Sequence, residues 1–169
     1  MRVFSVANQK GGTAKTSTAH ALITGATSKG KRALAIDFDP QGNLSFIMGA
    51  DANRPGAYEL MKQEVTASEA IQHTAQGDII PASLNLAGAD TEFSGKAGRD
   101  FFLQAALEPL QSLYDVVVID TSPRENNALP CTLSNKPSSA LSFLISSKPL
   151  PSTLFDSSIT RLLTAFFSA

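Results

Sequence analysis

The chain has 169 residues, of which 43% are hydrophobic and 17% are charged, and its formal net charge is −1. This length supports one domain with a buried core, and the composition excludes a disordered acidic tail, a collagen-like chain or a coiled coil as the whole molecule. The near-zero charge gives no general attraction to nucleic acid or acidic membranes. The single cysteine, Cys131, excludes a disulfide scaffold and a cysteine-built metal centre within one chain. No apolar run approaches the roughly 18 residues of a membrane span, so we expect a cytoplasmic protein that does not bind membranes.

The first forty residues predict a strand, a loop, a helix and a second strand. Residues 2–7 form a short apolar run that ends in a polar, glycine-containing turn. Apolar positions then recur at helical spacing from Thr16, and Gly30 lies where this helix should end. Residues 33–36 form the next apolar run. This order predicts a βαβ unit with a right-handed parallel connection.

The middle of the chain predicts shorter elements. We expect helices over residues 58–63 and 68–73, and a brief strand over residues 78–81. Residues 99–113 have a helical apolar pattern that Pro109 should kink or interrupt. Residues 116–119 are all β-branched, which predicts a central parallel strand covered on both faces.

The composition changes after about residue 130, where serine becomes frequent and Asp156 is the one acidic residue. One more strand over residues 141–145 and one more helix over residues 153–167 fit this part. We therefore expect residues 1–169 to form a single, partial α/β domain of three layers, with a mostly parallel sheet and helices on both faces. Residues 131–169 would be a divergent segment that leaves the sheet incomplete at the C-terminus, with an exposed edge.

The most specific motif lies between the first predicted strand and the first predicted helix. Its glycines let successive backbone N–H groups surround an anion, and the helix N-terminus adds the positive end of its dipole. Lys15 would reach the β- and γ-phosphates of a nucleotide, and the Thr16 hydroxyl would bind Mg²⁺. The alternative is a glycine-rich turn with incidental lysines. The predicted nucleotide-binding residues are Gly11, Gly12, Thr13, Ala14, Lys15, Thr16 and Ser17.

Two acidic turns follow other predicted strands. Asp39 lies in the turn over residues 37–43, where a carboxylate could bind Mg²⁺ or orient a water for in-line attack. Asp120 closes the β-branched run in a Walker B arrangement, in which the acid steadies the metal. A plain turn and a strand-capping aspartate are the respective alternatives. Taken with the phosphate loop, the two turns predict a P-loop NTPase-like fold that binds nucleotide phosphates and Mg²⁺.

The loop resembles the deviant Walker A motif K-G-G-x-x-K-[ST] of the ParA/MinD ATPases, with Lys10 as its leading lysine. Four segments together resemble a ParA-type partition ATPase of the Soj-like kind: Asn8-Gln9-Lys10-Gly11-Gly12, Asp37-Phe38-Asp39-Pro40-Gln41-Gly42-Asn43, Pro81-Ala82-Ser83-Leu84-Asn85-Leu86-Ala87-Gly88 and Tyr114-Asp115-Val116-Val117-Val118-Ile119-Asp120. The likeness covers residues 1–123. Ala14 stands where the family usually has glycine, and we expect its methyl group to require a negative φ.

The resemblance implies an ATP-dependent homodimer that sandwiches two nucleotides. Lys10 would cross to the partner's nucleotide, Lys15 would bind phosphate in its own subunit, and Asp39 would position the attacking water. Thr16 and Asp39 would serve the Mg²⁺, which Asp120 would hold through water. This catalytic set of Lys10, Lys15 and Asp39 would hydrolyse ATP slowly.

The resemblance also implies partners and a cellular role. A ParB-type protein on a centromere-like DNA site would stimulate hydrolysis, and the ATP dimer would bind DNA without sequence preference, which would place it on the nucleoid. The role would be plasmid or chromosome partitioning by a C-terminally shortened member without an extra N-terminal DNA-binding domain.

Three other functions stay open from the sequence. The chain could be an inactive or truncated nucleotide-binding remnant. A MinD-like membrane-cycling ATPase would need a basic amphipathic tail, and Arg161 is the one cation near the end. An iron–sulfur reductase of the nitrogenase iron-protein type would need bridging cysteines, whereas Cys131 has no second cysteine in the chain.

Overall fold

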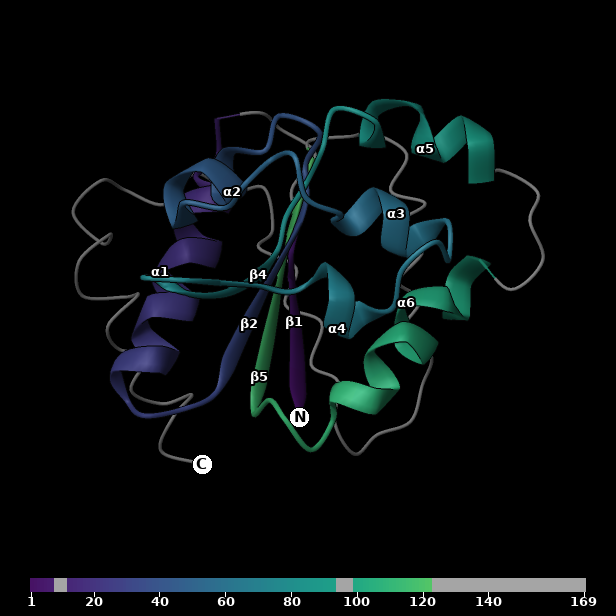
Figure 1. Cartoon of the computed structure of the whole chain (residues 1–169). Helices are drawn as coiled ribbons and strands as arrows, with labels where there is room; N and C mark the ends of the chain where they lie inside the picture. Colours follow the sequence, from purple (N-terminus) through teal and green to yellow (C-terminus); the bar gives the residue numbers. More distant parts are fainter. Residues whose placement is uncertain (8–11, 94–98, 123–169) are drawn as a thin grey trace.

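A five-stranded sheet forms the middle layer of the molecule (Figure 1). The computed structural model describes residues 1–7, 12–93 and 99–122. Within them the sheet has the order β1-β5-β2-β4-β3. β1, β5, β2 and β4 are parallel, and the short β3 pairs antiparallel with β4. The strands are β1 (Arg2–Val6), β2 (Ala33–Phe38), β3 (Gln72–Thr74), β4 (Gly77–Ile80) and β5 (Val116–Thr121).

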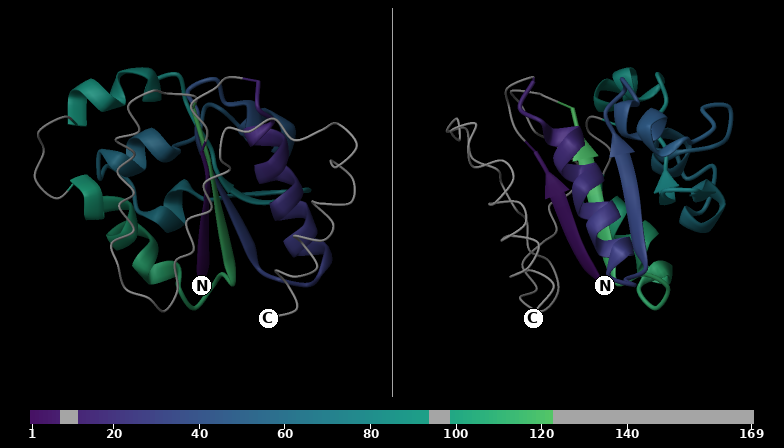
Figure 2. Two further views of the ribbon diagram at one scale, coloured as in Figure 1. Left: turned by 180° about the vertical axis from the view of Figure 1, so that it is seen from behind. Right: turned by 90° about the vertical axis from the view of Figure 1, so that its left-hand side faces the viewer.

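Helices cover both faces of this sheet, as the two views in Figure 2 show. α1 and α2 lie on one face, and α3, α4, α5 and α6 lie on the other. The helices are α1 (Lys15–Ser28), α2 (Asn43–Met48), α3 (Ala57–Met61), α4 (Ala67–Ala70), α5 (Leu86–Phe93), α6 (Arg99–Leu107) and the 3₁₀ turn η1 (Glu108–Leu110). The expected three-layer, mostly parallel α/β fold is confirmed.

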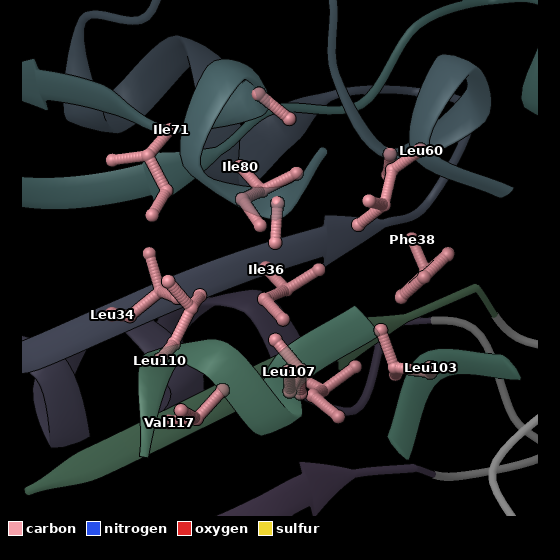
Figure 3. Packing of buried hydrophobic residues seen from close by; sticks show 14 of the residues in the cluster. Leu34, Ile36, Phe38, Leu60, Ile71, Ile80, Leu103, Leu107, Leu110 and Val117 are labelled. Atoms are coloured by element: carbon pink, nitrogen blue, oxygen red, sulfur yellow. The ribbon is translucent and has the colours of Figure 1, made fainter. Parts of the chain in front are cut away.

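The two central strands are buried along their whole length and supply both cores. Val117 and Ile119 of β5 join the core beneath α3 to α6, whereas Val116 and Val118 join the core beneath α1. β2 alternates in the same way, as expected from the two-residue period of a strand. Figure 3 shows the larger core, in which Leu34 and Ile36 of β2 lie opposite Leu107 of α6 and Leu110 of η1.

Small residues let α1 lie close to the sheet. Ala19, Ile23 and Ala26 of α1 have no exposed surface and pack on the β2 residues Ala33 and Ala35. Alanine on both sides of this contact brings the two backbones together, so the start of α1 has a fixed position relative to the strand ends.

Several element boundaries differ from the sequence prediction. The helix expected over residues 68–73 ends at Ala70, because Gln72–Thr74 pairs with β4 and the buried Gln72 side chain bonds the backbone of Asp51. Pro109 interrupts the helix as expected, since α6 ends at Leu107 and a 3₁₀ turn follows. α2 and α5 were not predicted from the sequence.

The prediction of a further strand, a further helix and a divergent segment over residues 131–169 falls outside the described residues. Across the part of the chain that the structure describes, no helix is long and apolar enough to span a bilayer.

Candidate functional site

The predicted site residues lie at the carboxyl ends of three neighbouring strands. β5 lies between β1 and β2, and the register places Val6 of β1 and Asp37 of β2 on either side of Asp120. The loop before α1 follows β1, and the turn with Asp39 follows β2. Ligands bind at this edge in open α/β sheets. The fold therefore brings the loop before α1 and the two acidic turns to one place, although two other strands separate β2 from β5 along the chain.

The loop before α1 uses two left-handed residues. Gly12 has φ +70°, and Ala14, the residue before the helix, has φ +58° and ψ +27°. The expected negative φ of Ala14 is therefore wrong: its backbone takes the conformation that glycine adopts without strain. The Ala14 carbonyl accepts hydrogen bonds from the amide and the hydroxyl of Thr18, both at 2.9 Å. These two hydrogen bonds fix the Ala14 carbonyl at the start of α1, and they help to hold Ala14 in the left-handed conformation that its methyl group disfavours.

The first turn of α1 combines a buried cation with the backbone N–H groups of a helix N-terminus. Lys15 is the first residue of the helix and only 8% of its surface is exposed. A lysine is rarely this buried unless it is paired with negative charge. Thr16 is partly buried and Ser17 is exposed. The helix dipole adds positive potential at the same point, so this end of α1 suits an anion.

Lys10 and Gly11 lie outside the described residues. Their predicted roles, the crossing lysine and the first glycine of the cradle, stay predictions.

Asp120 carries the strongest electrostatic signal of the site. It is fully buried, and its Oδ2 has no hydrogen-bond partner among the described residues. Burial is the main cause that raises the pKa of its carboxyl to about 6; the charges of Asp37 and Asp39 act in the same direction, and hydrogen bonds from Thr16 and from the Thr121 amide oppose them. A buried acceptor without a partner is costly unless a ligand completes it. Asp120 therefore has an oxygen available for a cation or a water beside Thr16.

Asp37 differs from Asp120 because both of its carboxylate oxygens accept hydrogen bonds from protein groups. Its Oδ1 accepts from the Asp39 amide at 3.0 Å, and its Oδ2 accepts from the amide and the hydroxyl of Ser45 at 2.8 and 2.7 Å. Burial raises the pKa of Asp37, and the bonds from Ser45 and Asp39 lower it. Sequence reasoning missed this role, since it depends on contacts between the end of β2 and α2.

Asp39 lies in a tight turn after β2. Its carbonyl accepts from the Gly42 amide at 2.8 Å, and its Oδ1 accepts from the Gln41 amide at 3.0 Å. Its side chain is largely buried, with 8% of the residue surface exposed. The plain-turn alternative is correct about the local geometry, but the turn also places a carboxylate next to Asp37 and Asp120.

The residues of the site fit Mg²⁺ bound together with a phosphate rather than by protein alone. No three His, Cys, Asp or Glu side chains form a metal cage within residues 1–7, 12–93 and 99–122. Mg²⁺ usually keeps several waters and is held by one or two carboxylates plus phosphate oxygens. The Thr16 hydroxyl and the open oxygen of Asp120 provide that partial set.

Comparison with known proteins places the chain in a family. Residues 1–149 match the family described as AAA domain. The chain belongs to this family. It is also similar to the chromosome partitioning protein ParA of Caulobacter vibrioides, with 38% identity over 132 residues, which cover 75% of this chain and 49% of that protein. The sporulation initiation inhibitor protein Soj of Bacillus subtilis is 35% identical over 127 residues, which cover 72% of this chain and 50% of Soj.

Solved structures agree with this AAA domain assignment. Cobyrinic acid a,c-diamide synthase from Mycobacterium smegmatis, with bound ADP and magnesium, has a TM-score of 0.69 and 40% identity, over 73% of this chain and 51% of that one. The ATP complex of a Cyanothece McdA variant has a TM-score of 0.66 and 29% identity, over 73% of this chain and 49% of that one. The chain spans about half the length of the relatives it matches. The resemblance to ParA/Soj-type proteins that the motifs predicted is confirmed.

Proposed function

We propose that this chain binds ATP and Mg²⁺ and acts as the ATPase part of a ParA/Soj-type partition system. The single observation that carries the proposal is the buried Asp120 at the end of the sheet where α1 begins: its carboxyl accepts a hydrogen bond from Thr16, and its Oδ2 has no partner among the described residues. Solved relatives that hold ADP, an ATP analogue or ATP, two of them from Mycobacterium smegmatis with magnesium, support the choice of ligand.

Each residue of the site then has a separate role. Lys15, with the backbone N–H groups of Gly12, Thr13, Ala14, Thr16 and Ser17, would hold the phosphates. Thr16 would bind Mg²⁺, Asp120 would hold it through water, and Asp39 would serve the metal and orient the attacking water. When bound, Mg²⁺ neutralises charge that develops on the transferring phosphoryl group. Because phosphoryl transfer depends mainly on positioning and electrostatics, these groups suffice for a slow reaction.

The proposal extends to the assembly that this family suggests. Two chains would close over two nucleotides, with Lys10 of each reaching the phosphates held by the other. A ParB-type partner bound to DNA would speed hydrolysis, and the ATP dimer would contact DNA without sequence preference, in the cytoplasm on the nucleoid. The similarity to ParA of Caulobacter vibrioides and Soj of Bacillus subtilis supports this arrangement.

Mg-ATP hydrolysis by four variants tests the assigned roles, with and without duplex DNA and a ParB-type partner. We expect Lys15→Ala to lose both ATP binding and turnover. We expect Asp39→Ala to keep ATP binding, measured by calorimetry, while its turnover falls by about 100-fold or more. The matched controls Lys31→Ala and Glu108→Ala remove exposed charges of the same kinds away from the site and should behave like the parent chain.

Two outcomes would contradict this assignment. Hydrolysis by Lys15→Ala and Asp39→Ala at the parent rate would refute the roles. ATP binding without turnover in the parent, even with partner and DNA present, would identify the chain as a nucleotide-binding remnant instead.

A further inference from the structure

Ser45, the third residue of α2, forms hydrogen bonds with Asp37 on one side and with Ala82 on the other. It is 8% exposed, and its hydroxyl donates to Asp37 Oδ2 at 2.7 Å while accepting from the Ala82 amide at 2.9 Å. Its own amide donates to the same carboxylate oxygen at 2.8 Å. The hydroxyl therefore joins the end of β2, the start of α2 and the segment that follows β4.

Asp37 links Ser45 to the turn that contains Asp39 through hydrogen bonds to both residues. The carboxylate accepts from Ser45 on one oxygen and from the Asp39 amide on the other, so it spans the turn between β2 and α2 from both ends. Within the turn, Asp39 Oδ1 accepts from the Gln41 amide. The orientation of Asp39 thus depends on a series of bonds that begins at Ala82.

The far end of this series is itself held firmly. The Pro81 carbonyl accepts from the Ala57 amide at 2.8 Å. A side chain at Gly56 would bring a Cβ within 2.2 Å of that carbonyl oxygen, so the start of α3 and the Pro81–Ala82 segment are in close contact. Ser45 therefore ties the turn to a fixed part of the larger core rather than to another loop.

We propose that Ser45 is a positioning residue that, acting through Asp37, keeps Asp39 in the place from which it orients the attacking water. This inference rests on the proposed ATPase function. Loss of the hydroxyl removes one bond to Asp37 and leaves the buried Ala82 N–H without its acceptor, so the turn relaxes. Lys15 and the loop before α1 hold the phosphates from a different element. Relaxation of the turn should therefore slow turnover and leave ATP binding intact.

Steady-state kinetics of three variants separate positioning from general damage. We expect Ser45→Ala to lower kcat by about 10- to 100-fold, the range usual for residues that support a catalytic group, with KM and the calorimetric Kd for Mg-ATP within about twofold of the parent. Ser45→Thr keeps the hydroxyl and should return kcat to within about threefold. Thr27→Ala removes a hydroxyl of an exposed residue near the other end of α1, which bonds the Ile23 carbonyl at 3.0 Å, and should leave both constants unchanged.

Amide hydrogen exchange on the nucleotide-free chain gives a readout that does not depend on activity. In Ser45→Ala we expect faster exchange at Asp39 and Ala82 and unchanged exchange in β5, whereas Thr27→Ala should leave the exchange of Asp39 and Ala82 unchanged. If the parent hydrolyses no ATP, the proposed function fails, yet the exchange rates still decide whether Ser45 holds the turn.

The proposal is overturned if Ser45→Ala keeps the parent kcat, if KM rises as much as kcat falls, or if exchange at Asp39 does not change. Should Ser45→Ala fail to fold, Asp37→Asn, which keeps the shape and weakens the acceptor, carries the same test. A kcat-selective loss in Asp37→Asn then supports the link, and parent kinetics refute it.

Discussion

Ala14 holds a backbone conformation that is unfavourable for a residue with a side chain. At φ +58° its Cβ approaches its own backbone, which costs roughly 1–2 kcal/mol relative to the right-handed region. Its neighbour Gly12, at φ +70°, takes a similar conformation without that cost. Positions 12 and 14 of the loop both have a backbone conformation that favours glycine, and of these two positions only position 12 has a glycine.

A reciprocal pair of substitutions measures this strain. We expect Ala14→Gly to raise the free energy of unfolding by up to about 1 kcal/mol, because relief of strain exceeds the greater entropy of the unfolded glycine chain. Gly12→Ala should lower it by about 1 kcal/mol. A Cβ at Gly12 would meet no atom within 4 Å, so that effect reports backbone strain alone. Urea unfolding of the nucleotide-free protein measures both, and an Ala14→Gly variant that is no more stable than the parent would contradict the strain at Ala14.

Sequence reasoning located the side chains to which we assign chemical roles better than the residues that hold them in place. Lys15 and Asp120 were predictable because each lies at a fixed offset from a recognisable strand. The hydrogen bonds of Asp37 were not predictable, because they depend on Ser45 in a helix that the apolar pattern did not indicate. The positive φ of Ala14 was missed since the type of residue argued against it.

At the scale of elements, the contact between α3 and the end of β4 depends on one glycine. A Cβ on Gly56 would lie 2.2 Å from the Pro81 carbonyl oxygen and 3.2 Å from the Pro81 ring. The same carbonyl accepts the first amide of α3, from Ala57. No side chain fits there unless these two segments separate.

Gly56→Ala should therefore be strongly destabilising. We expect a loss of about 2–4 kcal/mol in the free energy of unfolding, typical of overpacking combined with a broken backbone bond. Gly88→Ala in α5 is the matched control, because a Cβ there meets nothing within 4 Å and alanine favours the helix by about 1 kcal/mol. Thermal and urea unfolding distinguish them. A Gly56→Ala variant as stable as the parent would show that the two segments can separate without cost.

The elements with strong periodicity were predictable, and the short ones were not. β5 and α1 follow from uninterrupted apolar or helical patterns. α2 has six residues, of which Phe46 is 86% exposed and Ile47 is 40% exposed, so its sequence has no clear apolar face. β3 is a strand because it pairs with β4, and the local sequence of β3 does not indicate this pairing.

At the scale of the whole molecule, two carboxyl groups shape the dependence of stability on pH in opposite directions. Arg32 lowers the pKa of the exposed Asp115 to about 2, so this group stabilises the fold above pH 4 and loses that contribution as the pH falls towards 2. The pKa of Asp120 is raised to about 6, so the folded state loses stability as the pH rises from about 4 to about 6, and this contribution stays constant at higher pH.

Nucleotide-free protein should accordingly be less stable at pH 7.5 than near pH 4.5. We expect Asp120→Asn to reduce this fall, to which the raised pKa of the buried Asp37 also contributes: at pH 7.5 the variant gains on the order of 1–3 kcal/mol over the parent, and near pH 4.5 the two have similar free energies of unfolding. Asp115→Asn should instead be less stable than the parent at neutral pH and similar to it near pH 2. Urea unfolding across this pH range decides, and a parent curve that is flat between pH 4.5 and 7.5 would refute the raised pKa.

The overall architecture was predictable, because the strand–loop–helix–strand order and the all-β-branched run allow few arrangements besides a parallel three-layer fold. The strand order was not predictable from the apolar pattern alone. β5 is the last described strand in the sequence, yet it lies between β1 and β2, the first two.

That insertion has a consequence for synthesis. β1 and β2 leave the ribosome early with a gap between them, and only a nascent chain that has extended past residue 121 can fill it. The row of Val6, Asp120 and Asp37 then forms in one late step. Until this happens the growing polypeptide has two unpaired strand edges, and we expect it to need protection from aggregation during translation.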